Sequence, residues 1–291
     1  MAKIKIKDKQ FRTAGEKVLF SVMFAVFALY SASIIVSMAW AFMQSLKAGK
    51  GFYDDMLSLP KKWLFSNYAK ALTDIEYSDY NFFGMFINSI WFAAGSSILS
   101  VLSHCVTGYI FAKYRFKGRG AAFSFILFTI TLPVVGTLPS LYQVIYKMNI
   151  NDSPLFLITA LGGFGGNFLV TYAFFKGIDW SYAEAAFIDG AGHLYVFLRI
   201  MLPFAVGPVF ALSLLGFIGQ WNNYETPILF LDKMPVLSSG LYRFKVDADF
   251  EANSQPVLLA AVLLTSLPVL AAVAAFGGKI MKNVTMGGLK G

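Results

Sequence analysis

The stretch EAAFIDGAGHLYVFLRIMLP runs from Glu184 to Pro203 and lies between two long apolar segments. It nevertheless carries four ionisable side chains, namely Glu184, Asp189, His193 and Arg199. A charged side chain inside a bilayer costs several kcal/mol or more, so such residues are rare within membrane-spanning segments. We therefore expect this stretch to lie outside the lipid, on one face of a membrane protein.

The composition of the whole chain supports a membrane location. Of its 291 residues, 57% are hydrophobic and only 14% are charged, and the mean hydropathy is +0.62. Soluble domains carry about a quarter charged residues. The single cysteine, Cys105, excludes a disulfide within the chain, and no phosphate-binding GxxxxGK[ST] loop occurs. We therefore expect no ATP hydrolysis by this chain alone.

Six apolar segments are long enough to cross a bilayer, which requires roughly 20 residues each. The chain is thus predicted to be an all-α polytopic membrane protein with an N-terminal segment at 1–17, a transmembrane domain at 18–280 and a C-terminal tail at 281–291. The expected spans are about 18–43, 86–112, 121–146, 154–175, 203–220 and 256–279.

The distribution of basic residues predicts how this bundle is oriented. If the N-terminus is inside, 15 of the 24 lysines and arginines fall in inside segments, and the short loop at 113–119 alone holds four of them. Inside loops of membrane proteins are enriched in lysine and arginine. Both termini are therefore expected in the cytoplasm, and the net charge of +8 gives no reason to invoke nucleic acid.

The loop that contains the opening stretch has the pattern of two short helices. Ser181 is a candidate N-cap with Glu184 three residues later, which is a capping-box pattern. Asp189-Gly190 then interrupts the helix, because glycine readily adopts the left-handed angles of a turn. Composition leaves two interpretations open, a helix resting on lipid headgroups or a helix that docks a soluble partner.

The same stretch resembles the EAA motif of ATP-binding-cassette (ABC) importer permeases, whose pattern is E-A-A, three residues, G, nine residues, I, one residue, L-P. Every spacing matches, through Glu184, Ala185, Ala186, Gly190, Ile200, Leu202 and Pro203. The resemblance implies the six-helix fold of type I importer permeases, with a cytoplasmic loop that couples to an ATPase subunit. The residues expected to couple are Glu184, Ala185, Ala186, Asp189 and Gly190.

Two further segments extend the resemblance. QWNNYETPILFL is similar to a W-N-x-x-x-x-P element of the family, and the ending NVTMGGLKG is similar to the tail of carbohydrate permeases of the maltose-permease second-subunit type. That resemblance implies that the tail reaches the ATPase subunits through Thr285, Gly287 and Lys290, although Asn283 departs from the pattern.

The resemblance also implies partners and a division of labour. The chain would be the permease of a bacterial or archaeal cytoplasmic membrane, with a second permease subunit, two ATPase subunits that hold ATP and Mg²⁺, and an extracytoplasmic sugar-binding protein. This chain itself would need no cofactor or metal and would not be an enzyme.

Sugars are bound by aromatic rings and by hydrogen bonds from amide and hydroxyl groups. Residues of these types occur at expected cavity heights, although aromatic residues also gather at membrane interfaces. The candidates for the substrate pathway are Tyr142, Gln143, Trp221, Asn222, Asn223 and Tyr224. The alternative function is a secondary carrier or channel that works without an ATPase. It would usually need an ionisable group at membrane depth, and His104 is the clear candidate.

Overall fold

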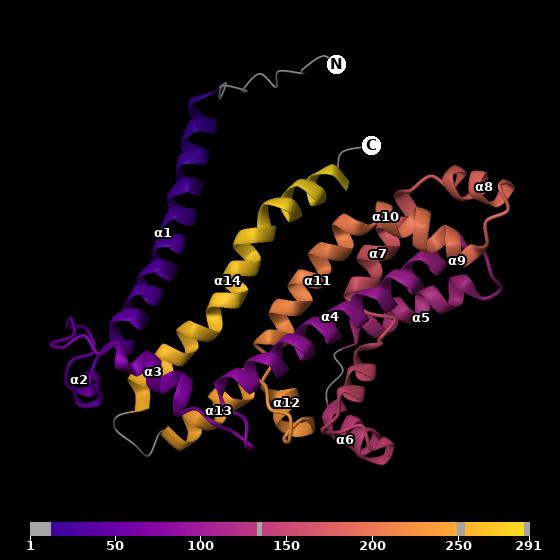
Figure 1. The fold of residues 1–291 in the computed structure, drawn as a ribbon. Helices are drawn as coiled ribbons and strands as arrows, with labels where there is room; N and C mark the ends of the chain where they lie inside the picture. The colour runs from indigo at the N-terminus through magenta and orange to yellow at the C-terminus, as the bar shows by residue number, and fades with distance from the viewer. Residues whose placement is uncertain (1–12, 133–135, 249–253, 288–291) are drawn as a thin grey trace.

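A computed structural model describes residues 13–132, 136–248 and 254–287, and the described residues form helices joined by short loops (Figure 1). Their bounds are α1 Ala14–Ser45, α2 Gly49–Asp54, α3 Ser66–Thr73, α4 Phe82–Lys113, α5 Arg119–Thr131, α6 Thr137–Met148, the 3₁₀ helix η1 Pro154–Ala160, α7 Gly166–Gly177, α8 Ser181–Ile188, α9 His193–Val196, the π-helix η2 Phe197–Met201, α10 Leu202–Phe204, α11 Val206–Trp221, α12 Glu225–Phe230, α13 Leu237–Ala248 and α14 Ser254–Gly287. Within these residues there is no strand, and the two-residue bridge Tyr77–Tyr80 is isolated.

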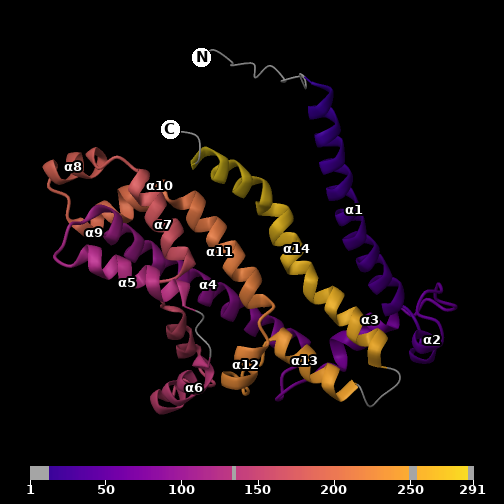
Figure 2. The ribbon, with the colours of Figure 1, turned by 180° about the vertical axis from the view of Figure 1, so that it is seen from behind.

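The long helices run between two ends of an elongated molecule. Helix α8, the first residues of α1 and the last residues of α14 lie at one end, and α2, α3, α6, α12 and α13 lie at the other (Figures 1 and 2). Helices α1 and α14 approach each other near α3 and separate toward the α8 end. The EAA loop, the N-terminal end of α1 and the C-terminal end of α14 therefore lie on the same side of the molecule.

Helix α4 is the centre of the bundle, with α7 and α11 packed along it. Small residues permit this close approach: a Cβ atom on Gly108 of α4 would lie 2.9 Å from the backbone N of Tyr172, and one on Gly216 of α11 would lie 2.8 Å from Oγ of Ser97. The hydroxyl of Ser97 donates to the carbonyl of Ser213 at 2.5 Å. Small residues and hydroxyl hydrogen bonds are typical of helix contacts within membranes, where burial of apolar surface gives little driving force.

Three helices in the described residues are long and apolar enough to cross a membrane, namely α1, α4 and the part of α14 from Ser254 to Gly278. The segments His193–Phe204 and Val206–Trp221 could together form a fourth span, bent by 77°. These correspond to four of the six predicted spans.

The predicted spans at 121–146 and 154–175 are not continuous helices. The first consists of α5 and α6, with α5 ending at Thr131 just before Pro133 and α6 beginning after Gly136, whose φ is +82°. The second consists of η1 and α7, separated by the glycine-rich segment 161–165. Proline interrupts a helix because it lacks a backbone N–H donor, and glycine does so because it loses more conformational entropy than other residues when it becomes helical. The count of six spans therefore stays a prediction.

Candidate functional site

Helix α8 ends in a hydrogen-bonded turn centred on Gly190. The backbone N–H of Gly190 donates to the carbonyl of Phe187 at 3.0 Å, and that of Ala191 donates to the carbonyl of Ala186 at 2.9 Å. These two bonds form a Schellman motif, which needs a left-handed residue after the helix. Gly190 provides it with a φ of +84°. The glycine at the fourth fixed position of the motif therefore has a structural reason: it ends α8 and turns the chain toward α9.

The start of α8 differs from the predicted capping box. The N-cap is Trp180, with no capping bond from its side chain, and Ser181 is the first helical residue. The carboxylate of Asp179 instead accepts the N–H of Ser181 at 2.9 Å. That bond, a bond to the Ser181 side chain and the nearby charge of Lys113 lower the pKa of Asp179. The prediction of Ser181 as N-cap was wrong because Ser181 is already helical: its own N–H donates to Asp179, and the N–H of Glu184 donates to the carbonyl of Trp180 at 3.1 Å.

The absence of a capping role leaves the side chain of Glu184 free. It is exposed and makes no hydrogen bond or ion pair with the residues that the structure describes. Ala185, Asp189 and Gly190 are exposed as well, and Ala186 is half-buried. The five residues predicted to couple therefore lie on one short connected segment, and four of them face solvent.

The opposite side of this segment packs on the end of α4 through an aromatic cluster. The cluster consists of Tyr109, Tyr114, Trp180, Phe187, His193 and Phe197. The hydroxyl of Tyr114 lies 2.9 Å from Nδ1 of His193, and the ring of Tyr109 lies 5.0 Å from that of Phe197. The sequence analysis did not predict that these six side chains meet. The signal was available, because Tyr109 and Tyr114 flank the basic loop and the others flank Gly190.

A further link joins the loop before α8 to α4. The ammonium group of Lys113, the last residue of α4, donates to the backbone carbonyl of Ile178. After the turn, the chain passes from α9 into the π-helix η2 and then bends at α10 by 77° to enter α11. Displacement of α8 would therefore act on α4 through the aromatic cluster and on α11 through this bent connection.

An open groove lies on the free side of this site. Its volume is about 580 Å³, and its lining includes Asp189, Gly190, Gly192, Tyr195 and Arg199. Both charged residues are exposed. The groove thus offers one negative and one positive side chain, with glycine backbone between them, to a protein that binds this end.

The predicted tail contacts cannot be placed beside this groove. Thr285 and Gly287 lie in the last turn of α14, whose end is on the same side of the molecule as α8 (Figure 1). Lys290 lies outside the described residues. In the described part of the chain no group of three or more metal-ligating side chains gathers.

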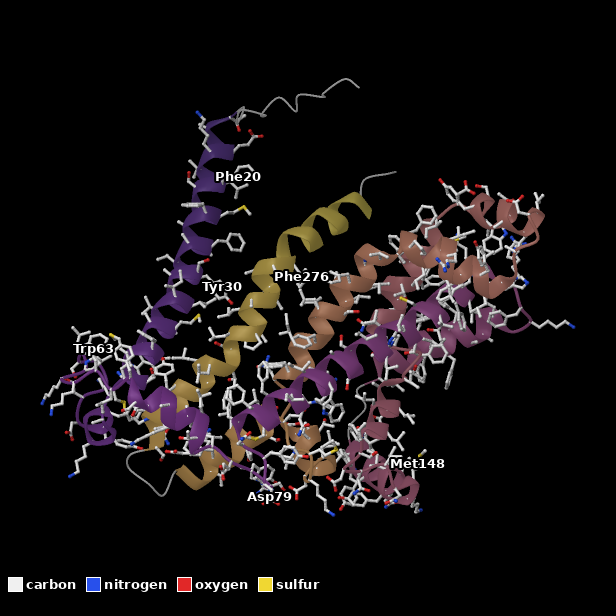
Figure 3. The ribbon with its side chains drawn as sticks, viewed as in Figure 1. Phe20, Tyr30, Trp63, Asp79, Met148 and Phe276 are labelled. Atoms are coloured by element: carbon white, nitrogen blue, oxygen red, sulfur yellow. The ribbon has the colours of Figure 1, made fainter. Side chains whose placement is uncertain are left out.

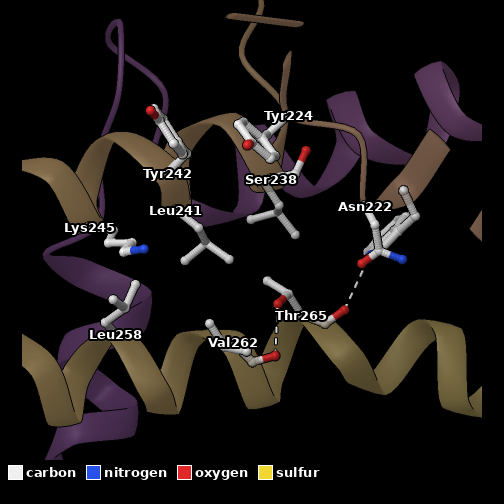
Figure 4. A pocket seen from close by; sticks show the side chains of 11 residues that line it. Asn222, Tyr224, Ser238, Leu241, Tyr242, Lys245, Leu258, Val262 and Thr265 are labelled. Carbon is white, nitrogen blue, oxygen red and sulfur yellow. Dashed lines mark hydrogen bonds between the residues drawn. The ribbon is translucent and has the colours of Figure 1, made fainter. Parts of the chain in front are cut away.

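The predicted substrate-pathway residues fall into two places. Trp221, Asn222 and Tyr224 line a groove of about 270 Å³ between α11, α13 and α14, at the end of the molecule opposite α8 (Figure 4). Tyr142 packs on Phe230 of α12 with ring centroids 6.0 Å apart, and Gln143 is exposed on the same helix α6. The structure therefore brings the first three together and leaves the α6 pair outside that lining.

Trp221, which lines this groove, and Asn223, which is not part of its lining, serve mainly as structural residues. The indole N–H of Trp221 donates to the carbonyl of Thr265 at 3.0 Å, and the residue is only 5% exposed. The amide of Asn223 bonds to Oε1 of Gln220 and to Oγ1 of Thr226, both at 3.1 Å. Their hydrogen-bonding groups are thus already occupied. The amide N–H of Asn222 also donates, to the carbonyl of Ile218 at 2.9 Å, but the side chains of Asn222 and Tyr224 are exposed.

Helix α13 adds residues to the groove that the sequence did not identify. The ring of Tyr242 stacks on that of Tyr224, with centroids 4.7 Å apart and planes within 13° of parallel. Ser238 and Lys245 of α13 also belong to the lining. Ser238, Tyr242 and Lys245 follow one another at intervals of about one helical turn along α13. That α13 lies beside the end of α11 is a tertiary feature, which no local sequence pattern predicts.

The comparisons with known proteins decide which family this architecture represents. A family described as "Binding-protein-dependent transport system inner membrane component" matches residues 105–277. The chain belongs to that family. The match covers the EAA loop, the aromatic cluster and the groove described above, and the chain is therefore a membrane permease subunit of a transport system.

Relatives and a solved structure agree with this assignment. The diacetylchitobiose uptake system permease of Streptomyces coelicolor is 30% identical over 272 residues, which are 92% of this chain and 88% of the relative. The maltodextrin transport system permease of Bacillus subtilis is 26% identical and covers 81% of this chain and 84% of the relative. A bacterial ABC transporter involved in the import of the acidic polysaccharide alginate shares the fold, with a TM-score of 0.75 over 92% of this chain and 99% of its own, at 20% identity.

Proposed function

We propose that this chain is one of two permease subunits of an ABC importer that takes up a sugar or oligosaccharide delivered by an extracytoplasmic binding protein. The relatives named above transport carbohydrates according to their names. Two ATPase subunits would hold ATP and Mg²⁺ and supply the energy, and the second permease would complete the pathway. The alternative of a carrier without an ATPase has no support from the family or from its relatives.

The observation that carries the proposal is the construction of the α8 segment. Gly190 ends the helix in a Schellman turn, the buried side packs on the end of α4, and the other side exposes Glu184 and Asp189 beside an open groove. An exposed carboxylate without an internal partner is available for a charge-assisted bond from another protein. We therefore assign this face to the ATPase, which requires that both termini and α8 lie in the cytoplasm.

The groove at the opposite end supports a carbohydrate substrate. Asn222, Ser238, Tyr224 and Tyr242 supply amide and hydroxyl groups, and the stacked tyrosines expose about 40% of each ring, 38% for Tyr224 and 40% for Tyr242. Flat rings beside hydrogen-bonding groups suit saccharides, which have apolar faces and polar edges. We propose that this groove contacts the sugar as it leaves the binding protein.

The function is tested with the complete transporter in proteoliposomes. Uptake of labelled diacetylchitobiose, an arabinooligosaccharide and a maltodextrin is measured in turn, with the binding protein outside and ATP inside. We expect ATP-dependent uptake of one of these saccharides, reduced at least severalfold by Tyr224→Ala and unchanged by the control Lys147→Ala at an exposed position of α6. Uptake of none of them, together with binding-protein-dependent uptake of an amino acid or peptide, would reject the carbohydrate assignment. Uptake of a saccharide without any ATPase subunit would reject the ABC importer itself.

A further inference from the structure

The segment between α1 and α3 is a folded loop pinned to the end of the first span. The indole N–H of Trp40 donates to the carbonyl of Met56 at 2.8 Å, and the N–H of Leu64 donates to the carbonyl of Leu46 at 2.9 Å. The side chain of Asn67 donates to the carbonyl of Lys47 at 2.9 Å. These bonds hold a short stretch of chain, 46–64, against the membrane-facing helix α1.

This loop encloses a pocket with an almost buried ammonium group. The pocket has a volume of about 540 Å³ and is lined by Lys47, Lys61, Lys62, Asp54 and Asp55, among others. Lys47 is only 3% exposed. Its ammonium donates to the backbone carbonyl of Asp55 at 2.6 Å, and no second acceptor for it appears among the described residues. A lysine ammonium has three N–H donors, so two remain available to a ligand that supplies oxygen acceptors.

The acidic residues of the pocket offset only part of its positive charge. The carboxylate of Asp55 accepts the backbone N–H groups of Leu57 and Ser58, at 3.0 and 3.1 Å, and so caps its own turn. Lys61 and Lys62 are exposed at the mouth. Three lysines thus face two aspartates, which leaves one positive charge in excess. The open donors point to an anionic ligand.

Leu59 belongs to the lining of this charged pocket, and the apolar residues Leu57 and Trp63 adjoin lining residues in the sequence. Leu57 is 83% exposed, Leu59 65% and Trp63 51%, and Trp63 lies at the foot of α1, where the span ends (Figure 3). Tryptophan and lysine side chains beside exposed apolar residues are typical of the level of lipid headgroups. A soluble anion would make no favourable contact with Leu57, Leu59 and Trp63. A phospholipid would place its acyl chains along α1 and its phosphate at the lysines.

We propose that the pocket formed by Lys47, Lys61 and Lys62 binds the phosphate of a phospholipid in the leaflet opposite α8, with Leu57, Leu59 and Trp63 in contact with its glycerol and upper acyl chains. The site would anchor the loop and fix the height of α1 in the membrane. It is independent of which solute the transporter carries and of how the ATPase docks.

The experiment measures lipid retained by the purified transporter in detergent, by native mass spectrometry. The probes are dioleoylphosphatidylglycerol, dioleoylglycerol, which has the same chains without phosphate, and inorganic phosphate. The test variant is Lys61→Gln/Lys62→Gln, and the matched control is Lys50→Gln/Lys70→Gln, which removes the same charge from exposed positions outside the pocket lining. Since a basic residue near an anionic membrane surface contributes about 1 kcal/mol, the test variant is expected to weaken phosphatidylglycerol binding roughly 10- to 30-fold.

Three results would support the site together. First, phosphatidylglycerol is retained and dioleoylglycerol is not. Second, the test variant loses that retention while the control variant keeps it. Third, inorganic phosphate at about 10 mM, a concentration that would fill a free-anion site with a Kd of about 1 mM, fails to displace the lipid. Equal retention of both lipids, or equal losses in both variants, would overturn the proposal. Full displacement by inorganic phosphate would show a site for the free anion and would also overturn the assignment to lipid.

Discussion

The hydroxyl of Tyr114, just beyond the end of α4, lies 2.9 Å from Nδ1 of His193 at the start of α9. The same hydroxyl is 3.3 Å from that of Tyr109, and the Tyr114 ring contacts those of Trp180 and His193 edge-on at 5.8 and 5.5 Å. One tyrosine thus joins both sides of the Gly190 turn to the helix at the centre of the bundle. This contact and the bond from Lys113 to the carbonyl of Ile178 link the α8 segment to the end of α4.

Removal of that hydroxyl is expected to loosen the loop. A net hydrogen bond contributes about 1 kcal/mol, so Tyr114→Phe should raise the rate of amide hydrogen exchange in residues 181–196 by roughly fivefold. The control is Tyr182→Phe, which deletes a hydroxyl from the same loop that makes no hydrogen bond with the described residues. Equal exchange rates in both variants would show that the Tyr114–His193 bond does not hold the loop.

Gly190 offers a test of backbone conformation separate from sterics. A Cβ atom there would meet no atom within 4 Å, yet φ is +84°. Gly190→Ala should therefore destabilise the turn by about 1 kcal/mol through left-handed strain alone, whereas Gly190→Asn should cost less, because asparagine tolerates these angles. Hydrogen exchange at the Gly190 and Ala191 positions reports the turn directly. An asparagine variant as exchange-labile as the alanine variant would contradict this account of the glycine.

The bond between Asp179 and the N–H of Ser181 predicts a pH dependence at the start of α8. The pKa of Asp179 is lowered from 3.8, first by this bond. A lowered pKa means that the carboxylate stabilises the fold when ionised, so the contribution is complete above about pH 4 and is lost as pH falls through the folded-state pKa. The exchange rate of the Ser181 and Tyr182 amides, corrected for intrinsic pH effects, should rise below that range in the wild type but not in Asp179→Asn. A pH-independent wild type would refute the assignment.

The predicted orientation can be checked with two single cysteines. Tyr53 in α2 and Lys117 between α4 and α5 are exposed at opposite ends of the molecule, and the native Cys105 is fully buried. In intact cells an impermeant thiol reagent should label Tyr53→Cys and spare Lys117→Cys, since the basic loop is expected inside. Labelling of both after permeabilisation is the control. The reverse pattern in intact cells would invert the topology and remove α8 from the cytoplasm.

Comparison of sequence and structure shows where local patterns suffice. The EAA spacing located α8 and its terminating glycine, because a Schellman turn is a local motif. The N-cap residue of α8 and the structural roles of Trp221 and Asn223 could not be predicted from local patterns. Trp221 has the residue type of a sugar platform, but its N–H bonds to Thr265, 44 residues away. Contacts of that kind depend on how distant helices pack, and a single sequence does not contain them.

The interruption of two predicted spans has a similar cause. Hydropathy averages over about 20 residues and cannot see one Gly136 at a positive φ or the glycine run at 161–165. Backbone breaks of this type are tolerated at membrane depth when neighbouring protein covers them. That these two segments are helical was therefore predictable from composition, whereas the breaks within each helix were not.

The central claim is that the exposed face of α8 binds an ATPase subunit and transmits its closure. The most direct test is substrate-stimulated ATP hydrolysis by the reconstituted transporter carrying Glu184→Lys, with Glu76→Lys, an exposed carboxylate at the opposite end, as control. Loss of a charge-assisted bond should weaken ATPase docking roughly 10- to 100-fold. The account predicts that Glu184→Lys inserts normally but loses stimulation by the loaded binding protein, while Glu76→Lys retains it. Full stimulation in the Glu184→Lys transporter would contradict the claim.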